Sequence, residues 1–192
     1  MTIQNVISVF LFALFIVIVL IRAAILRRRG IRTIVFGQTD KSDFVLVPLV
    51  LAIAYTVLAG TFGLPIWDVL IHPLFTGDHL GWIGLTLCLI ATACFILTLV
   101  SFGDSFRVGI DTNKPSNLIT GGMFAISRNP IYVCFLLFLT GLFFIHANIV
   151  IAVMGILFVL AIHRQILREE KFLGEHYGAE YEAYCKKVRR YV

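Results

Sequence analysis

The sequence predicts an all-α integral membrane protein with about five transmembrane helices, a C-terminal helical hairpin and a cytosolic interfacial helix. Hydrophobic residues make up 59% of the 192 residues and charged residues only 14%, at a mean hydropathy of +0.95. A soluble domain of this composition would expose larger apolar patches than monomers in water tolerate. Uncharged runs also exceed the ~18 residues of a spanning helix four times, at 1–21, 44–67, 80–103 and 129–162.

The last of these runs is too long to be one span. At roughly 1.5 Å per residue it would make a helix about 50 Å long, whereas the hydrocarbon core is ~30 Å thick. The polar residues His146 and Asn148 near its middle indicate a tight turn between two helices. We therefore expect one domain over 1–192, with a cytosolic C-terminal segment at 165–192. The expected spans are about 4–26, 44–62, 80–102, 130–146 and 148–164.

The basic residues predict the orientation of these spans. Lys and Arg occur between the first and second spans, between the third and fourth, and in the tail, but not in 63–79 or 146–148. The positive-inside rule then places the N-terminus outside and the C-terminus in the cytosol. The membrane would be the inner or cell membrane in a bacterium and the endoplasmic reticulum in a eukaryote. The net charge of +5 matches this topology and anionic lipid, so we expect no nucleic-acid partner.

Neither cysteine nor histidine spacing indicates a metal site. The four cysteines form no CxxC pair and three lie in expected spans, which indicates small core residues. The five histidines are scattered along the chain rather than paired at ligand spacing. We therefore expect no bound metal and a lipid bilayer as the main partner.

A first polar cassette, 118–132, lies at the predicted cytosolic face. Its Gly122, which follows another glycine, permits close approach of the backbone to a ligand. Pro130 suits the first position of the fourth span, with Asn129 as its cap. N–H groups at this helix start, beside Arg128, would favour an anion or carboxylate. The alternative is that these residues only start the helix and anchor it.

A second polar cassette, Arg168-Glu169-Glu170, follows the fifth span. A charge at the centre of a spanning helix costs about 2.5–3.5 kcal/mol, so the helix must leave the hydrocarbon near His163. Adjacent glutamates point about 100° apart, so one can face the bundle and hold a cationic or hydroxyl-bearing ligand while the other faces water. The alternative is a solvated run of charges. An apolar stripe follows, which fits either packing on the bundle or an interfacial aromatic belt: Leu173, Tyr177, Tyr181, Tyr184 and Val188.

In order and spacing, the two cassettes resemble the isoprenylcysteine carboxyl methyltransferase family of small membrane enzymes and related phospholipid-methylating proteins. The resemblance covers about the C-terminal two-fifths of the chain. It rests on Leu118-Ile119, Gly122, Phe124, Arg128-Asn129-Pro130, Tyr132, Glu169-Glu170, Tyr177-Gly178, Tyr181, Tyr184 and Arg189.

The resemblance implies S-adenosylmethionine-dependent methyl transfer at the cytosolic membrane face. The methyl acceptor would enter from the membrane and be isoprenylcysteine-carboxylate-like or lipid-like. Residues implied to line the cofactor are Ser116, Asn117, Leu118, Ile119, Gly122, Phe124, Asn129, Pro130, Ile131, Tyr132 and Glu169. Implied catalytic residues are Arg128, Asn129 and Glu170, and implied substrate-binding residues are Arg164, Gln165 and Arg168.

Two departures from the family pattern leave the substrate open. Asn129 replaces a histidine, which removes a titratable group, although its amide can still form hydrogen bonds. Gln165 aligns with an arginine that would meet a substrate carboxylate. Two other classes also remain as alternatives, a non-catalytic membrane scaffold and a nicotinamide-dependent membrane reductase. The chain contains no GxGxxG motif that would support the reductase.

Overall fold

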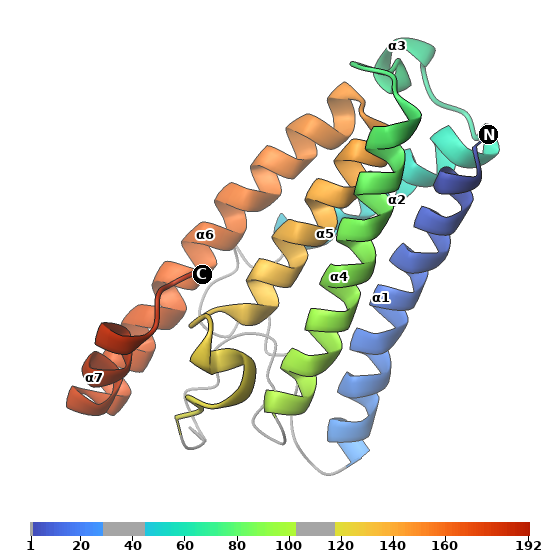
Figure 1. The fold of residues 1–192 in the computed structure, drawn as a ribbon. Helices are drawn as coiled ribbons and strands as arrows, with labels where there is room; N and C mark the ends of the chain where they lie inside the picture. Colours follow the sequence, from blue (N-terminus) through green and yellow to red (C-terminus); the bar gives the residue numbers. More distant parts are fainter. Residues whose placement is uncertain (1, 29–44, 103–117) are drawn as a thin grey trace.

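The computed structural model describes residues 2–28, 45–102 and 118–192, which fold into helices (Figure 1). No strand occurs in these ranges, and their one isolated β-bridge joins Pro73 to Asn148. The helices are α1 (Ile3–Arg28), α2 (Leu46–Phe62), α3 (Asp68–Ile71), α4 (Asp78–Phe102), the 3-10 helix η3 (Gly122–Ala125), α5 (Pro130–His146), α6 (Ile149–Tyr177) and α7 (Ala179–Lys187).

Apolar composition and length make α1, α4 and α6 long enough to cross a bilayer, and α2 and α5 are shorter apolar helices of 17 residues each. Large apolar side chains on their outward faces stay exposed, such as Phe10 on α1 and Val100 on α4. Water would not tolerate such a surface, whereas lipid does. The chain is therefore an integral membrane protein.

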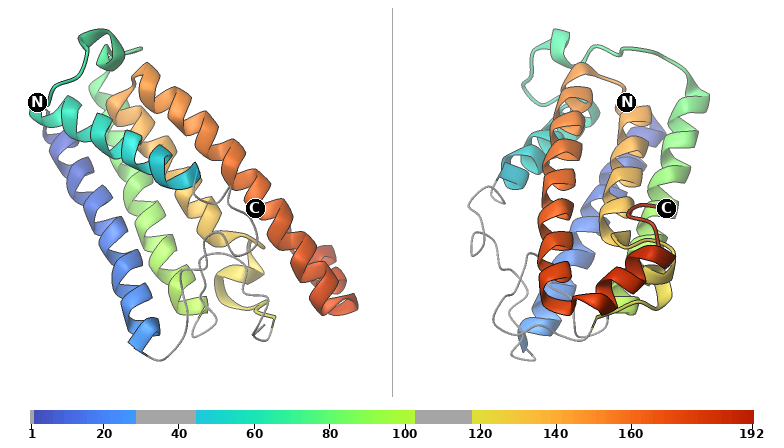
Figure 2. Two further views of the ribbon diagram at one scale, coloured as in Figure 1. Left: turned by 180° about the vertical axis from the view of Figure 1, so that it is seen from behind. Right: turned by 90° about the vertical axis from the view of Figure 1, so that its left-hand side faces the viewer.

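Four helices, α1, α4, α5 and α6, lie side by side, and α2 lies across α1 and α6 (Figures 1 and 2). Aromatic rings fill the centre of this bundle. The ring of Phe15 stacks on that of Phe95 at 4.3 Å and contacts that of Phe138 at 4.8 Å. This core lies in the middle of the bundle and leaves both ends for polar groups.

Glycines bring α4 and α5 together. A Cβ atom on Gly84 would lie 2.5 Å from the carbonyl oxygen of Gly141, and a Cβ on Gly141 would lie 2.6 Å from the sulfur of Cys88. Such distances are shorter than van der Waals contact, so only glycine lets the two backbones approach this closely. The close packing fixes the position of α5, whose first turn carries part of the first cassette.

The connection between α5 and α6 consists of Ala147 and Asn148. The side-chain oxygen of Asn148 accepts a hydrogen bond from the backbone N–H of Ile151 at 3.0 Å and caps α6. Its amide nitrogen donates to the carbonyl of His146 at 3.0 Å. This cap sets the position from which α6 runs back along α5.

Helix α6 extends well beyond the expected span. The span is expected to end near 164, and the helix continues beyond it to Tyr177, because most residues that follow His163 are good helix formers. Gly174 lies within the helix without ending it, and Gly178 follows its last residue. Gly178 adopts φ 51°, and α7 then folds back beside η3 (Figure 2). The expected apolar stripe is therefore divided between two helices rather than carried by one.

The two ends of the bundle differ in charge and content. The C-terminal end of α1 with Arg27 and Arg28, the 3-10 helix η3 and α7 lie at one end, and the N-terminus and α3 lie at the other (Figure 1). We term these the cassette end and the α3 end. The basic residues described by the structure thus accompany both polar cassettes.

Candidate functional site

The first cassette is attached to the end of α4 through Gly122. This glycine adopts φ +61°, and a Cβ atom there would lie 2.4 Å from the hydroxyl oxygen of Ser101. The same hydroxyl accepts a hydrogen bond from the N–H of Met123 at 3.1 Å. The preceding Gly121 has open space around it, so the requirement for glycine lies at Gly122.

Asn129 precedes α5 as predicted, and Pro130 takes the first helical position, but the Asn129 side chain does not cap the helix. The predicted capping role is therefore wrong. The side-chain amide donates instead to the carboxylate of Glu170 at 3.1 Å and to the carbonyl of Arg190 at 3.2 Å. The hydrogen bond to Glu170 is the stronger of the two, because its acceptor is charged. Through this bond, Asn129 of the first cassette is linked to the second cassette.

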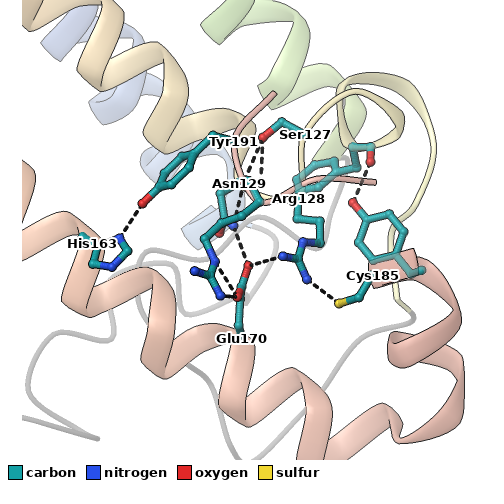
Figure 3. Close-up of polar contacts among 10 residues, drawn as sticks. Ser127, Arg128, Asn129, His163, Glu170, Cys185 and Tyr191 are labelled. Atoms are coloured by element: carbon teal, nitrogen blue, oxygen red, sulfur yellow. Dashed lines mark hydrogen bonds and ion pairs between the residues drawn. The ribbon is translucent and has the colours of Figure 1, made fainter. Parts of the chain in front are cut away.

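Glu170 is the centre of this first group of contacts (Figure 3). Its carboxylate lies 3.4 Å from the guanidinium of Arg128 and accepts from Nε and Nη2 of Arg190 at 2.9 and 2.8 Å. Only 10% of the Glu170 side chain is exposed. The hydrogen bond to Glu170 raises the pKa of the Arg190 guanidinium. A shielded carboxylate with two cationic partners and an amide is held rigidly.

The C-terminal residues after α7 complete this group of contacts. The backbone N–H of Arg128 donates to the carbonyl of Arg189 at 3.0 Å, and the hydroxyl of Ser127 donates to the carbonyl of Arg190 at 3.3 Å. The Tyr191 hydroxyl lies 2.6 Å from Nδ1 of His163 on α6. The last residues of the chain therefore lie between the start of α5 and α6 (Figure 3).

Sequence reasoning missed the roles of Ser127, Arg190 and Tyr191. Topology alone accounts for a basic tail, and the resemblance assigns the family's basic position to Arg189, whose side chain is exposed. Two adjacent arginines in an extended segment point to opposite sides. That alternation indicates that one of the pair faces the protein, although it does not say which.

Glu169 is the centre of a second group of contacts. Its carboxylate accepts from the hydroxyl of Tyr132 at 2.6 Å and from the amide of Gln165 at 2.9 Å. The Gln165 oxygen in turn accepts from Nη2 of Arg168 at 2.5 Å. Both glutamates thus contact residues of the first cassette, which corrects the prediction that one of them faces water.

The α7 helix packs on the first cassette through its tyrosines. Tyr184 donates to the carbonyl of Phe124 at 2.6 Å, and burial raises its pKa to about 12. Burial also raises the pKa of Tyr181. Tyr181, Tyr184 and Val188 form a buried cluster with Leu118 and Leu173 against it. The stripe therefore packs on the protein, although it is divided between α6 and α7.

The remaining predicted site residues occupy different environments. Phe124 and Pro130 are buried, Ile131 packs against the bundle core, Ile119 is half-buried and Arg164 is exposed. Cys185 is only partly buried, beside the cluster of Tyr181, Tyr184 and Val188, and its sulfur accepts a hydrogen bond from Arg128. Ser116 and Asn117 lie outside the described residues. Within the described ranges, no three His, Cys, Asp or Glu side chains lie together in a group that could hold a metal ion.

The site therefore joins the start of α5 to the outer part of α6. Tyr132 and Glu169 place an aromatic ring beside a carboxylate, and Arg128 and Glu170 form a neighbouring charged pair. Aromatic faces and carboxylates are the groups that proteins use to hold ligand cations and ammonium groups. The arrangement can bind a ligand that carries positive charge.

Comparison with known proteins assigns the region that carries both cassettes to a known family. Residues 80–180 match the phospholipid methyltransferase family, a region that runs from α4 into α7 and includes both cassettes. Two relatives from rice, one in Oryza sativa subsp. indica and one in subsp. japonica, are described as "Probable protein-S-isoprenylcysteine O-methyltransferase". Each is 31% identical over 114 residues, which cover 56% of this chain and 58% of the relative. The family match covers more than half of this chain, and the chain therefore belongs to the phospholipid methyltransferase family.

Proposed function

We propose that this protein is an S-adenosylmethionine-dependent methyltransferase that acts at the cytosolic membrane face on a membrane-dissolved substrate. The observation that carries the proposal is that Tyr132 of the first cassette contacts Glu169 of the second, while Arg128 and Asn129 contact Glu170. These residues come together at one end of an apolar bundle. The family and the names of the rice relatives support the same reaction class.

The side chains at the cassette end fit such a cofactor. S-adenosylmethionine carries an ammonium and a sulfonium, and the site offers the Glu169 carboxylate beside the Tyr132 ring, which contacts Phe135 edge-on at 6.2 Å. The residues proposed to hold the cofactor are Ser116, Asn117, Leu118, Ile119, Gly122, Phe124, Asn129, Pro130, Ile131, Tyr132 and Glu169.

When bound, the cofactor supplies an electrophilic methyl group, so that transfer to a carboxylate oxygen releases no proton whereas transfer to a neutral amine releases one. The protein mainly has to orient the acceptor and exclude water. Arg128 and Glu170 hold the start of α5 against α6, and Asn129 positions groups without titrating. We assign these three residues to catalysis in that positioning sense.

Substrate recognition is proposed for Arg164, Gln165 and Arg168 on α6. Gln165 is buried, and its amide is bonded at one side to Glu169 and at the other to Arg168. A prenylcysteine carboxylate would therefore meet one of the two arginines rather than Gln165. A lipid amine, whose proton a glutamate can accept, fits the two carboxylates as an alternative acceptor.

We also propose a five-span topology, with α2 and α5 crossing the membrane in addition to the three longer helices. Each of the two has 17 residues, the lower limit for a span. If α5 crosses the membrane and α6 runs back beside it, the start of α5 and the C-terminal part of α6 lie at the same end of the bundle. The N-terminus would then face the outside and the site the cytosol.

Calorimetric titration of the purified protein with S-adenosylmethionine and S-adenosylhomocysteine tests the function. We expect micromolar binding that Glu169→Gln weakens by about tenfold or more, because the variant keeps the size of the side chain but loses one charge-assisted contact. Glu175→Gln on the same helix is the matched control, since Glu175 is exposed and forms a surface ion pair with Lys171 at 3.8 Å.

Three outcomes would contradict the proposal. Absence of binding by folded wild-type protein would favour a scaffold, and binding of a reduced nicotinamide instead would favour a reductase. Equal affinities of Glu169→Gln and wild type would remove Glu169 from the cofactor site. A screen of prenylated cysteine and lipid amines with radiolabelled methyl donor then identifies the acceptor class.

A further inference from the structure

The connection between α2 and α4 carries an unusual amount of exposed apolar surface. We term its residues 64–77, which include α3, the α3 cap. Trp67 is 79% exposed, Val69 74% and Leu74 53%. No Lys or Arg occurs from 63 to 79. Large apolar side chains exposed next to one another mark a surface that contacts a partner or a membrane.

The α3 cap is nevertheless attached to the bundle at two places. At its start, the Tyr55 hydroxyl on α2 donates to the carbonyl of Pro65. Near its end, the backbone N–H of Leu74 donates to the carbonyl of Ala147 at 2.6 Å, and Pro73 bridges Asn148. The cap is therefore held directly over the α5–α6 turn (Figure 1).

An aromatic contact strengthens the second attachment. The ring of Phe75 meets that of Phe143 edge-on at 5.6 Å and lies 6.5 Å from the ring of Phe144. Phe75 thus packs on α5, whereas Trp67 and Val69 point away from the protein. The cap has one face bound to the bundle and another that is apolar and unpaired within the described chain.

The length of α5 explains why the turn needs a cover. Its 17 residues span about 25 Å, less than the ~30 Å hydrocarbon core. With its first turn at one interface, its last turn stops short of water at the other. Backbone groups that face hydrocarbon cost several kcal/mol when unsatisfied, and the Leu74 N–H supplies the Ala147 carbonyl with a partner.

We propose that the α3 cap lies in the headgroup layer of the membrane, with Trp67 and Val69 inserted among the lipids, and seals the α5–α6 turn from the hydrocarbon. Tryptophan favours this depth because its ring is apolar and its N–H needs a polar partner. The partner surface is the membrane leaflet at the α3 end. This placement is independent of the chemistry at the cassette end.

The chain has two tryptophans, Trp67 and Trp82, so its fluorescence can report on the cap directly. In Trp82→Phe protein reconstituted in phosphatidylcholine vesicles, all tryptophan emission comes from Trp67. We expect a spin label near the ester end of the acyl chain to quench this emission about twofold more than one near the chain's middle, as for a ring at headgroup level. Aqueous acrylamide should quench it weakly.

The reciprocal variant Trp67→Phe is the control, and subtracting its emission from that of wild type isolates Trp67 even if Trp82→Phe folds poorly. Emission quenched by acrylamide but not by lipid labels would overturn the proposal, because the cap would then lie in water. Stronger quenching by the deeper label would overturn it as well. A third outcome is that neither quencher reaches Trp67 in vesicles with several copies of the protein, but that both do so in vesicles with a single copy. That result would overturn the proposal and assign this face to a contact with a second copy of the chain.

Discussion

At the residue scale, the carboxylate of Glu170 is the contact that joins three distant segments of sequence. Its partners are Arg128 before α5, Asn129 beside it and Arg190 near the C-terminus. When one of these partners is removed, the shielded negative charge of Glu170 keeps fewer hydrogen bonds. The resulting loss of stability is larger than the loss from breaking an exposed ion pair. The stability of the site therefore depends on the last residues of the chain.

Replacement of Arg190 by alanine tests this dependence. We expect the free energy of unfolding to fall by about 1–2 kcal/mol, because Glu170 loses two charge-assisted hydrogen bonds but water reaches part of the vacated space. Unfolding in mixed micelles with rising dodecyl sulfate measures the change. Arg189→Ala is the matched control, since its side chain is exposed. Equal losses in both variants would contradict the assigned role of Arg190.

Tyr184 gives the site a dependence on alkaline pH. Burial raises its pKa from 10.0 to about 12, so the folded protein keeps a proton that the unfolded chain releases. The folding stability that this protonated tyrosine contributes is therefore fully present below pH 10, and it is lost as the pH rises from 10 toward 12. Wild type should lose more thermal stability than Tyr184→Phe between about pH 10 and 12. Parallel losses in the two proteins would contradict the prediction.

Residues that act through distant partners were the hardest to predict. The sequence identifies Asn129 and Pro130 as the start of a helix, which the structure confirms, but the amide of Asn129 turns to Glu170 rather than to the helix. Local sequence specifies the backbone at this point. The choice between capping and a tertiary contact depends on a carboxylate 41 positions later, which no local pattern contains.

At the element scale, the contact between α4 and α5 determines where the first cassette lies. Gly141→Ala should lower the free energy of unfolding by about 1–3 kcal/mol, because its Cβ would overlap the carbonyl of Gly84 and the sulfur of Cys88. Gly155→Ala is the control on α6, where a Cβ would make ordinary contact at 3.5 Å with Leu139. There the helix propensity of alanine should leave stability equal or higher. Thermal and detergent unfolding measure the stability of both variants. Equal losses of stability in Gly141→Ala and Gly155→Ala would refute an interface that requires glycine.

Hydropathy predicts the apolar helices well, because lipid selects continuous apolar runs and charges mark their ends. The turn at Ala147 and Asn148 lies where the polar residues indicate it. The end of α6 was not predictable from the same rule. Hydropathy reports where a helix leaves lipid, whereas the helix itself ends only at Gly178, and the two positions differ because helices continue into water.

At the scale of the whole molecule, positive charge and polar contacts gather at one end of the bundle. The cassette end includes Arg27 and Arg28 on α1 and Lys186 and Lys187 on α7. The α3 end has an apolar cap and no Lys or Arg from 63 to 79. By the positive-inside rule this asymmetry favours the proposed orientation. Under the two proposals above, the membrane faces would have different tasks, with polar contacts at one and lipid sealing at the other.

The asymmetry predicts that an epitope tag at the C-terminus stays in the cytosol, while one at the N-terminus is outside. In sealed spheroplasts, an added protease should remove the N-terminal tag and leave the C-terminal tag until the membrane is opened. The result follows because translocation of the cassette end would carry its basic residues across the membrane, and Lys and Arg near span ends resist this transfer. Protease sensitivity of the C-terminal tag in intact spheroplasts would reverse the orientation and place the Glu169 and Glu170 contacts outside the cell, away from cytosolic S-adenosylmethionine.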